Sequence, residues 1–376
     1  MKQELCVLHV GNVLLGNPYT GLTAARCKEC YRRFPEVFDS LFEYIRTQGV
    51  DLVLFSGNLC GRYLTSEDAE HLIKMLASVP ECRFVISPGD QDPFAPDSLY
   101  ASGRLPSNVY IFENESLDHF DFEELGVRVY GWAIHGQRSS FAPLAGAAVT
   151  EQELVNLISG CCDISSRTLF AHASVEEIAA FGADYAALCH GAATPIRTAG
   201  ATQYCHAGFL EGRSFEEGGR GGFHRIDIQR VDGEKQLTAS FVPLSRHHYE
   251  TVTIDITGVT GMADVLTHVR SAVEEGGFGP ETSLRVILEG ELEPTVLLRH
   301  TIEETRAVDL YSLDFIDHTL PTLDTEKLEH DMTVRGELYR MLKKRLKTGT
   351  LEDRIAVAQA LRAGLAALES RDITMI

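Results

Sequence analysis

Five short apolar runs in this chain each lead into a polar residue of a type that binds metal ions. Apolar runs of this length with Gly or Pro after them are typical of buried strands. Layered folds place their ligand sites at the carboxyl ends of such strands. We therefore predict one metal-centred site assembled from separate strand ends. The runs are 6–10, 52–55, 84–86, 169–171 and 185–189, and the polar residues are Asn12, Asn58, Asp90, His172 and His190.

The order of these motifs resembles that of SbcD-type (YhaO-like) DNA-repair exonucleases in the calcineurin-like metallophosphoesterase superfamily. That family reads Asp-x-His-x-Gly after its first strand, Gly-Asp after the second and Gly-Asn-His-Asp after the third, then a lone His and Gly-His-x-His. Five motifs in order are a specific signal for the fold. The matching stretches here are 12–16 (NVLLG), 57–58 (GN), 89–92 (GDQD), His172 and 189–192 (CHGA), with 208–215 (GFLEGRSF) resembling a further family stretch.

The resemblance implies an α+β fold in four layers, with two mixed sheets flanked by helices, a small α/β capping domain and C-terminal helices. We expect a metallophosphoesterase domain over 1–245, a capping domain over 246–322 and a helical partner-binding segment over 323–376. Hydrophobic periodicity adds particular elements to this plan. It predicts helices over 22–48, 66–78 and 262–275, and strands over 251–256 and 284–290.

The resemblance also implies two divalent ions bridged by one carboxylate, and most ligands of the first ion are replaced. Asn12, Leu14, Asn58 and Ala192 stand where the family has Asp, His, Asp and His. Leucine and alanine cannot bind a metal, and a hard dication prefers carboxylates to neutral amides. We therefore expect the first ion to be absent. Asn12 and Asn58 would then keep the loops folded by hydrogen bonding, without the uncompensated charge of a carboxylate that has lost its ion.

By the same resemblance, the second ion would be held by Asn58, Asp90, His172 and His190. Two imidazoles, one carboxylate and one amide oxygen suit manganese, zinc or iron. Each histidine taken alone is equally consistent with a buried residue that only makes hydrogen bonds. The sequence therefore leaves two outcomes open, one divalent metal ion or none.

Three more residues near these motifs affect the expected chemistry. Gln91 replaces a catalytic His of the family, and glutamine cannot act as a general acid near neutral pH. Losing that His together with one ion predicts a rate lower by several powers of ten. His206 is either an accessory ligand or a structural histidine. Asp92, which precedes a proline, is either an accessory ligand or the brace of a turn.

Composition restricts the partners and the compartment. The net charge of −20 disfavours extensive nucleic-acid contact, although a local basic patch for DNA remains open. The main basic cluster, within 340–347, is interpreted as a solvated helix face. Nine cysteines are expected as free thiols, and no apolar run approaches the ~20 residues of a membrane helix. With no N-terminal signal segment in view, we expect a cytoplasmic protein without membrane contact.

The last predicted helix carries an apolar seam with spacings of 4, 3, 3, 4 and 3. We expect Leu351 and Ile355 to pack onto the chain's own core, whereas packing onto a partner helix is the hypothesis for the remainder of the seam. The resemblance implies that C-terminal helices grip the coiled-coil root of an SMC-like ATPase, and it is also compatible with a homodimer. The seam consists of Leu351, Ile355, Ala358, Leu361, Leu365 and Leu368.

Three hypotheses on function follow. The count of lost ligands favours a pseudoenzyme, a degenerate exonuclease subunit with weak or lost hydrolase activity that acts as a scaffold for an SMC-like ATPase. The second hypothesis is a working single-metal phosphodiesterase or exonuclease that uses Asp90, His172 and His190. The third is a non-enzymatic protein that binds a DNA end or a phosphate.

Overall fold

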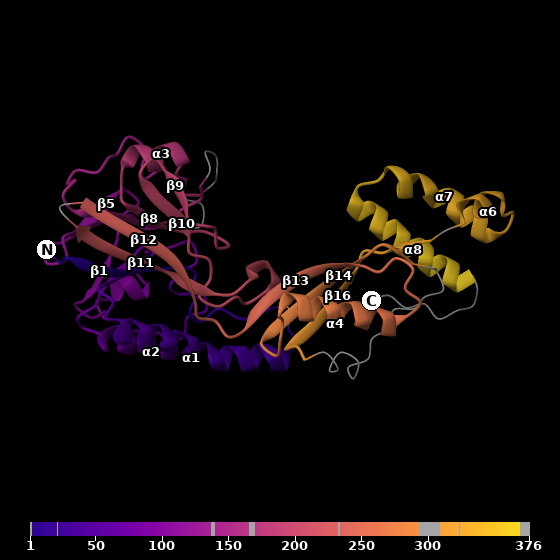
Figure 1. The fold of residues 1–376 in the computed structure, drawn as a ribbon, viewed down its shortest axis with the longest axis horizontal. Coiled ribbons are helices and arrows are strands. Elements are labelled where there is room, and N and C mark those ends of the chain that lie inside the picture. Colours follow the sequence, from indigo (N-terminus) through magenta and orange to yellow (C-terminus); the bar gives the residue numbers. More distant parts are fainter. Residues whose placement is uncertain are drawn as a thin grey trace. The chain divides into compact units, whose positions relative to one another are not determined.

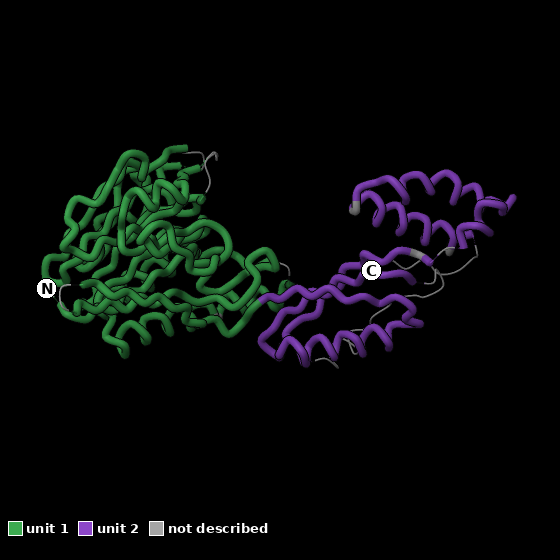
Figure 2. The backbone as a smooth tube through the Cα atoms, turned by 45° about the horizontal axis from the view of Figure 1, so that its top comes forward, with its two compact units in different colours: residues 1–248 green, residues 249–376 purple. Residues whose placement is uncertain are grey.

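The computed structural model describes residues 2–20, 22–136, 140–164, 170–231, 234–292, 309–322 and 324–368. The chain divides into two compact units, Met1–His248 and Tyr249–Ile376 (Figure 2). The expected capping domain includes residues 293–308, which lie outside the described residues. None of the helices in the described part of the chain is long and apolar enough to cross a membrane.

Two six-stranded mixed sheets form the first unit (Figure 1). The first sheet contains β1 (Glu4–Val10), β2 (Leu52–Phe55), β3 (Arg83–Ile86), β4 (Val109–Ile111), β11 (Gly222–Val231) and β12 (Glu234–Pro243). Its order is β12-β11-β1-β2-β3-β4. Strands β1 to β4 are parallel neighbours, whereas β11 is antiparallel to both β1 and β12. The carboxyl ends of β1, β2 and β3 therefore share one edge.

The second sheet is built on the same plan. It contains β5 (Asp118–Phe122), β6 (Val127–Gly131), β7 (Val155–Cys161), β8 (Tyr185–Cys189), β9 (Arg197–Ala199) and β10 (Thr202–His206). Its order is β5-β6-β7-β8-β10-β9, with β6, β7, β8 and β10 parallel and an antiparallel strand at each edge. The carboxyl ends of β7 and β8 therefore also lie side by side.

Helices cover the outer faces of both sheets, which completes the four layers expected from the resemblance. Helices α1 (Ala24–Gln48) and α2 (Ser66–Ala77) lie on one side and α3 (Val175–Phe181) on the other (Figure 1). Phe42 of α1 packs on Phe84 of β3, with ring centroids 5.8 Å apart. The predicted helices 22–48 and 66–78 are confirmed, and a Thr65–Asp68 capping box fixes the start of α2.

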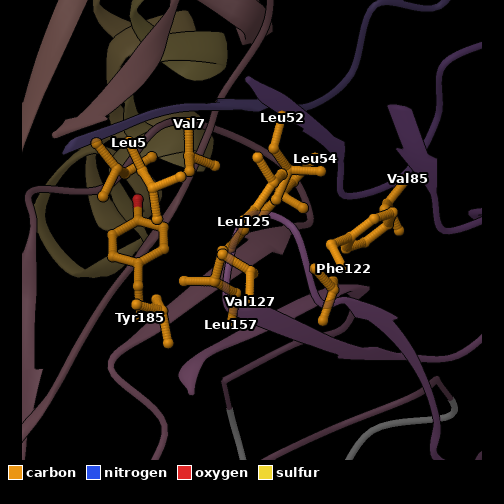
Figure 3. Packing of buried hydrophobic residues seen from close by; sticks show 14 of the residues in the cluster. Leu5, Val7, Leu52, Leu54, Val85, Phe122, Leu125, Val127, Leu157 and Tyr185 are labelled. Carbon is orange, nitrogen blue, oxygen red and sulfur yellow. The ribbon is translucent and has the colours of Figure 1, made fainter. Parts of the chain in front are cut away.

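The inner faces of the two sheets enclose one apolar core (Figure 3). Because parallel strands covered on both faces are buried throughout, they appear in the sequence as continuous apolar runs such as 52–55. A second cluster, which includes Trp132 and Phe181, lies between the second sheet and α3. Labelled members of the inner core are Leu5, Val7, Leu52, Leu54, Val85, Phe122, Leu125, Val127, Leu157 and Tyr185. Two 3-10 helices, Leu99–Ser102 and Phe215–Glu217, lie in connections of this unit.

One predicted strand is wrong. The run 169–171 was expected to form a buried strand that ends at His172, but Phe170 and Ala171 lie outside the strands and residue 169 is not described. The neighbours of β8 are instead β7 and β10, so both of its edges are already occupied. A run of three residues is too short to compete with the seven residues of β7 for that edge.

The second unit combines a small sheet with helices. The strands are β13 (His248–Asp255), β14 (Thr282–Glu289), β16 (Ser312–Asp317), β15 (Glu291–Leu292) and β17 (Leu320–Pro321), and the helices are α4 (Met262–Gly276), α6 (Thr325–His330), α7 (Val334–Thr348) and α8 (Leu351–Leu368). The first three strands form one sheet in the order β13-β14-β16, and its apolar face packs on α4. The predicted strands 251–256 and 284–290 and the helix 262–275 are confirmed.

The apolar seam of α8 packs largely inside its own unit. Leu361 and Leu365 are buried with Leu328 of α6 and Tyr339 of α7. An ion pair of 2.8 Å between Arg362 and Asp317 also ties α8 to the end of β16. For Leu361 and Leu365 the expected contact with a partner helix is therefore wrong, because these side chains are already buried within their own unit.

Candidate metal centre

The loops that follow β1, β2, β3, β7 and β8 meet at one place in the first unit. The backbone N–H of Asn12 donates to the Gly57 carbonyl at 3.1 Å, which joins the loops after β1 and β2. The Asn12 side-chain amide donates to the Gly191 carbonyl at 3.0 Å, which joins them to the loop after β8. The loops that contain Asn12, Asn58 and Gly191 thus meet at the carboxyl ends of both sheets.

Three residues in these loops have left-handed backbone conformations that side chains rarely adopt. Their φ angles are 43° at Asn12, 53° at Leu14 and 54° at Asn58. Asparagine tolerates this region, but at a leucine it costs roughly 1–2 kcal/mol. Backbone hydrogen bonds of 2.9 Å from Leu14 to Asn58 and 3.1 Å from Leu15 to Leu59 maintain it. Such strain is typical of ligand-binding loops held by their surroundings.

The buried side chain of Arg213 holds the loop after β1 by hydrogen bonds to its backbone carbonyls. Its Nη2 donates to the carbonyl of Val13 at 2.5 Å and of Leu14 at 3.2 Å, and its guanidinium stacks on Phe34, 4.7 Å from the ring centroid. Arg213 lies in the 208–215 stretch, which is more than one hundred and ninety residues beyond Leu14 in the sequence. The stretch therefore fixes the shape of the loop and offers no ligand of its own through this arginine.

A chain of amide hydrogen bonds occupies the positions assigned to the first ion. Asn58 Nδ2 donates to Asn12 Oδ1 at 2.9 Å and to Asp90 Oδ1 at 3.1 Å. The Asn58 oxygen accepts from the backbone N–H of Gln91 at 2.9 Å. In this arrangement Asn58 presents N–H protons where a metal ligand would have to offer a lone pair. Its side-chain oxygen already accepts a hydrogen bond. Leu14 is buried and apolar, and Ala192 is exposed on the loop after β8.

A group with ligands for one ion lies beside this amide chain. Ligand atoms of Asp90, Cys161 and His190 lie within 4.8 Å of one another, with Cys161 buried and the other two half-buried. Contact with Cys161 raises the pKa of His190. Contact with Cys189 and burial raise the pKa of the Cys161 thiol. A bound cation would compensate for both effects by favouring the thiolate and the neutral imidazole.

Cys161 is the residue that the sequence analysis missed. It ends β7, directly opposite Cys189 of β8 in the strand register. Ser87 and Ser159 join the two sheets nearby through hydroxyl groups 3.0 Å apart. The available signal was the segment 155–161 (VNLISGC), which contains Val155, Leu157 and Ile158 and ends at a thiol, a group that binds zinc well.

His172 lies apart from this group. It forms an isolated bridge with Asp163, and its Nδ1 lies 3.1 Å from the Phe170 carbonyl. No group of ligand atoms found among the described residues includes it. His206 is buried, with Nε2 3.2 Å from the Cys162 carbonyl, and burial lowers its pKa. Its ring therefore has the environment of a structural histidine.

Gln91 and Asp92 both lie in the loop after β3, where Gln91 contacts Asp90 and Asp92 binds backbone N–H groups. Gln91 Nε2 donates to Asp90 Oδ2 at 2.6 Å, which orients that carboxylate. The carboxylate of Asp92 is buried and accepts from the backbone N–H of Gly89 at 2.8 Å and of Cys60 at 2.9 Å, and from the Tyr100 hydroxyl. Burial raises the pKa of Asp92 to about 6. Asp92 braces the loops after β2 and β3.

Comparisons with known proteins add little to this geometry. No known family model matches the sequence, and no curated protein matches it. Among solved structures, TT1561 of Thermus thermophilus is 11% identical, with a TM-score of 0.37 over 62% of this chain and 98% of that one. Vacuolar Protein Sorting 29 from Cryptosporidium parvum is 14% identical, with a TM-score of 0.31 over 64% and 100%. Such values assign neither family nor function to this chain.

Replacing Asp92 by alanine should lower the free energy of unfolding by about 3 kcal/mol, because two backbone N–H groups and the Tyr100 hydroxyl lose their acceptor in the interior. Urea unfolding followed by circular dichroism measures the change. The control is Asp97→Ala, an exposed aspartate five positions away in the same loop, which should stay within about 0.5 kcal/mol of the parent. Equal effects of the two variants would show that Asp92 is no brace.

The variant Asn58→Asp tests the amide chain. Without metal it should lose about 3 kcal/mol of stability, because a buried carboxylate replaces the donor to Asn12 and Asp90. Added Mn²⁺ should recover part of that loss, since a carboxylate at this position can bind the ion. Asn58→Ala should lose comparable stability and recover none of it. Urea unfolding in EDTA and in Mn²⁺ distinguishes these outcomes, and recovery in both variants would contradict the assignment.

Proposed function

We propose that this chain is a degenerate SbcD-type homologue in the calcineurin-like metallophosphoesterase superfamily, which binds one metal ion, hydrolyses phosphodiesters weakly or not at all, and acts as a scaffold. One observation carries the proposal. Asn12 and Asn58 form an amide chain at positions where the resemblance implies ligands of a first ion, while Asp90, Cys161 and His190 lie grouped beside it. The two-sheet sandwich with its site at converging strand ends supports the same ancestry.

The surviving group fits zinc better than manganese. One carboxylate and one thiolate balance the charge of a dication, and the thiolate with an imidazole forms a borderline-soft ligand set. Asp90 and His190 are half-buried, so a fourth position can open to solvent or to a phosphate oxygen. A zinc ion bound there would supply Lewis-acid polarisation of that oxygen. The positioning of the phosphate would depend on Gln91, whose amide already holds Asp90.

The same surroundings explain why hydrolysis should be weak. A two-ion site stabilises both the attacking and the leaving oxygen, and a single ion can serve only one of them. Gln91 stands where the family has a catalytic histidine, and it cannot donate a proton to a leaving group near neutral pH. Stabilisation of transition-state charge usually contributes more to catalysis than any other effect. Loss of one ion and one proton donor therefore favours the scaffold over the working single-metal enzyme.

Metal content of the purified protein tests the proposal. The variants Cys161→Ser and His190→Ala should each contain about one zinc ion per chain less than the parent, because each removes one of three ligands. His172→Ala is the control and should keep its zinc, since that side chain lies outside the group. Elemental analysis after gel filtration gives the stoichiometry. Zinc lost in His172→Ala and His190→Ala but kept in Cys161→Ser would restore the ligand set expected from the sequence and overturn this one.

Hydrolysis of bis(4-nitrophenyl) phosphate separates the scaffold from the enzyme. Zinc- or manganese-loaded protein should show a rate close to that of the free ion in buffer, because one ion without a proton donor stabilises little transition-state charge. A robust rate that disappears in His190→Ala would establish the single-metal phosphodiesterase instead. Metal-independent DNA binding with a steep salt dependence would favour the third hypothesis, a protein that binds a DNA end.

The scaffold role concerns the second unit, and its partner is proposed to be an SMC-like coiled-coil ATPase. Val334 and Met341 of α7 are 67% and 71% exposed and stand seven residues apart, so they lie on one face of the helix. Exposed large apolar residues on a shared face are typical of interaction surfaces. The basic residues of α7 are less suited to this role, because Arg340, Lys343 and Arg345 form ion pairs within the unit.

Co-purification with a co-expressed SMC-like ATPase tests this surface. The double variant Val334→Glu/Met341→Glu should reduce recovery of the partner at least tenfold, because two charges would enter an apolar contact. Lys344→Ala, an exposed position of the same helix, is the control and should leave recovery unchanged. Equal recovery with all variants would remove α7 from the interface.

A further inference from the structure

We propose that the interior of the first unit holds a second metal site, formed by His9, Cys205 and His224 with Tyr185, which takes a thiophilic divalent ion of the zinc type. The inference does not depend on the proposed function. It uses none of the residues assigned to the candidate metal centre.

The three side chains come from both sheets and meet inside the sandwich. His9 of β1 and His224 of β11 are partners in the strand register, and their rings stack with centroids 5.7 Å apart. Cys205 belongs to β10 of the other sheet. Ligand atoms of all three lie within 4.8 Å of one another. His9 and Cys205 are fully buried and His224 is 3% exposed, so the group faces no solvent.

The ring of His9 is oriented as a ligand. Its Nε2 lies 3.0 Å from the Leu188 carbonyl, and because a carbonyl can only accept, this nitrogen carries the proton. The lone pair is therefore on Nδ1. Metal-binding histidines almost always donate their other N–H to such an acceptor. A backbone carbonyl of β8 thus fixes the tautomer of His9 that is able to bind an ion.

Distances around Nδ1 match those of a shared ion. His9 Nδ1 lies 3.8 Å from Cys205 Sγ. Bond lengths of about 2.05 Å to nitrogen and about 2.3 Å to sulfur, at an angle of about 110–120°, separate the two atoms by about 3.6–3.8 Å. The Tyr185 hydroxyl lies 3.0 Å from the same nitrogen and 3.1 Å from the sulfur. These are hydrogen-bond distances, and with its proton released the same oxygen would serve as a fourth ligand. Figure 3 shows it pointing toward Leu5 and Val7 of β1.

His224 has a buried ring nitrogen that a metal ion could bind. Its Nδ1 is buried and has no hydrogen-bond partner among the described residues. A buried polar atom without a partner costs about 1–3 kcal/mol, which a metal bond would offset. Phe241 covers the outer side of the ring, with centroids 5.4 Å apart, and His9 stacks on it as well. The ring is thus held firmly while one of its polar atoms is left unsatisfied.

Charge balance favours zinc in this apolar core. On binding, the Cys205 thiol and the Tyr185 hydroxyl would each release one proton to solvent, and the two anions would neutralise the dication. Two neutral imidazoles bring the set to four ligands, the number that closed structural zinc sites use. With no open position and no solvent contact, the ion would tie β1 and β11 to β10. Its effect is therefore on stability, not on catalysis.

Cobalt replacement tests the site in the full-length protein. Cells grown with Co²⁺ in place of Zn²⁺ should yield protein with a thiolate-to-cobalt charge-transfer band and tetrahedral visible bands. The experiment is done in the Cys161→Ser background, which removes the thiol of the candidate metal centre. The band should persist in Cys161→Ser and in Cys161→Ser/Cys82→Ser, where Cys82 is a buried thiol outside the cluster. It should disappear in Cys161→Ser/Cys205→Ser, with about one cobalt ion per chain lost.

A second variant keeps the test decisive if Cys205→Ser does not fold. His224→Phe preserves the aromatic stack, and in the Cys161→Ser background it should lose the tetrahedral bands while circular dichroism stays unchanged. Folded Cys161→Ser protein without a charge-transfer band would overturn the proposal. A band that survives both Cys205→Ser and His224→Phe would overturn it as well. Failure of the proposed function would instead appear in the elemental analysis, as no zinc lost in Cys161→Ser or His190→Ala relative to the parent, with the cobalt band unchanged here.

Discussion

The hydrogen bond from the Asn58 amide to the Asp90 carboxylate is the contact on which the site depends. It joins the loop after β2 to the loop after β3, and a second bond from the same amide reaches Asn12 in the loop after β1. A bridging cation would otherwise have to neutralise carboxylates at these positions. Because one amide group donates two protons, it satisfies two acceptors without any charge of its own. The loops thus keep left-handed conformations that include the strained Leu14.

Much of the fold follows from local patterns. The run 52–55 is apolar throughout because β2 is covered on both faces, and the Thr65–Asp68 box marks the start of α2 in the sequence itself. The convergence of strand ends follows from parallel order, which placed Asn12, Asn58 and Asp90 correctly near one another. By contrast, the order of strands within each sheet and the left-handed backbone at Leu14 depend on contacts between distant segments, such as Arg213 with the Leu14 carbonyl.

The difference between Cys161 and His172 shows where a residue-type argument fails. The run 169–171 is apolar and precedes a histidine in the expected motif order, so the sequence predicts a strand that ends at His172. The residue that reaches the site depends on which segment pairs with the edge of β8. Five residues of β7 pair there, which is a longer ladder than three residues could form. The pairing of β7 with β8 places Cys161 beside Asp90 and His190. Ligand identity is therefore a consequence of strand pairing, which a single sequence does not reveal.

The group at the strand ends and the group around His9 differ in how deeply they are buried. At the strand ends, Asp90 and His190 are half-buried, so water can solvate them. The neutral amides of Asn12 and Asn58 stand beside them and need no cation to balance a charge. Three residues before Asn12, His9 lies in a fully buried group where water cannot replace a lost partner. There Nδ1 of His224, for which the described part of the chain provides no hydrogen-bond partner, is buried in the interior. An interior ion would therefore matter more for the stability of this fold than an ion at its surface site.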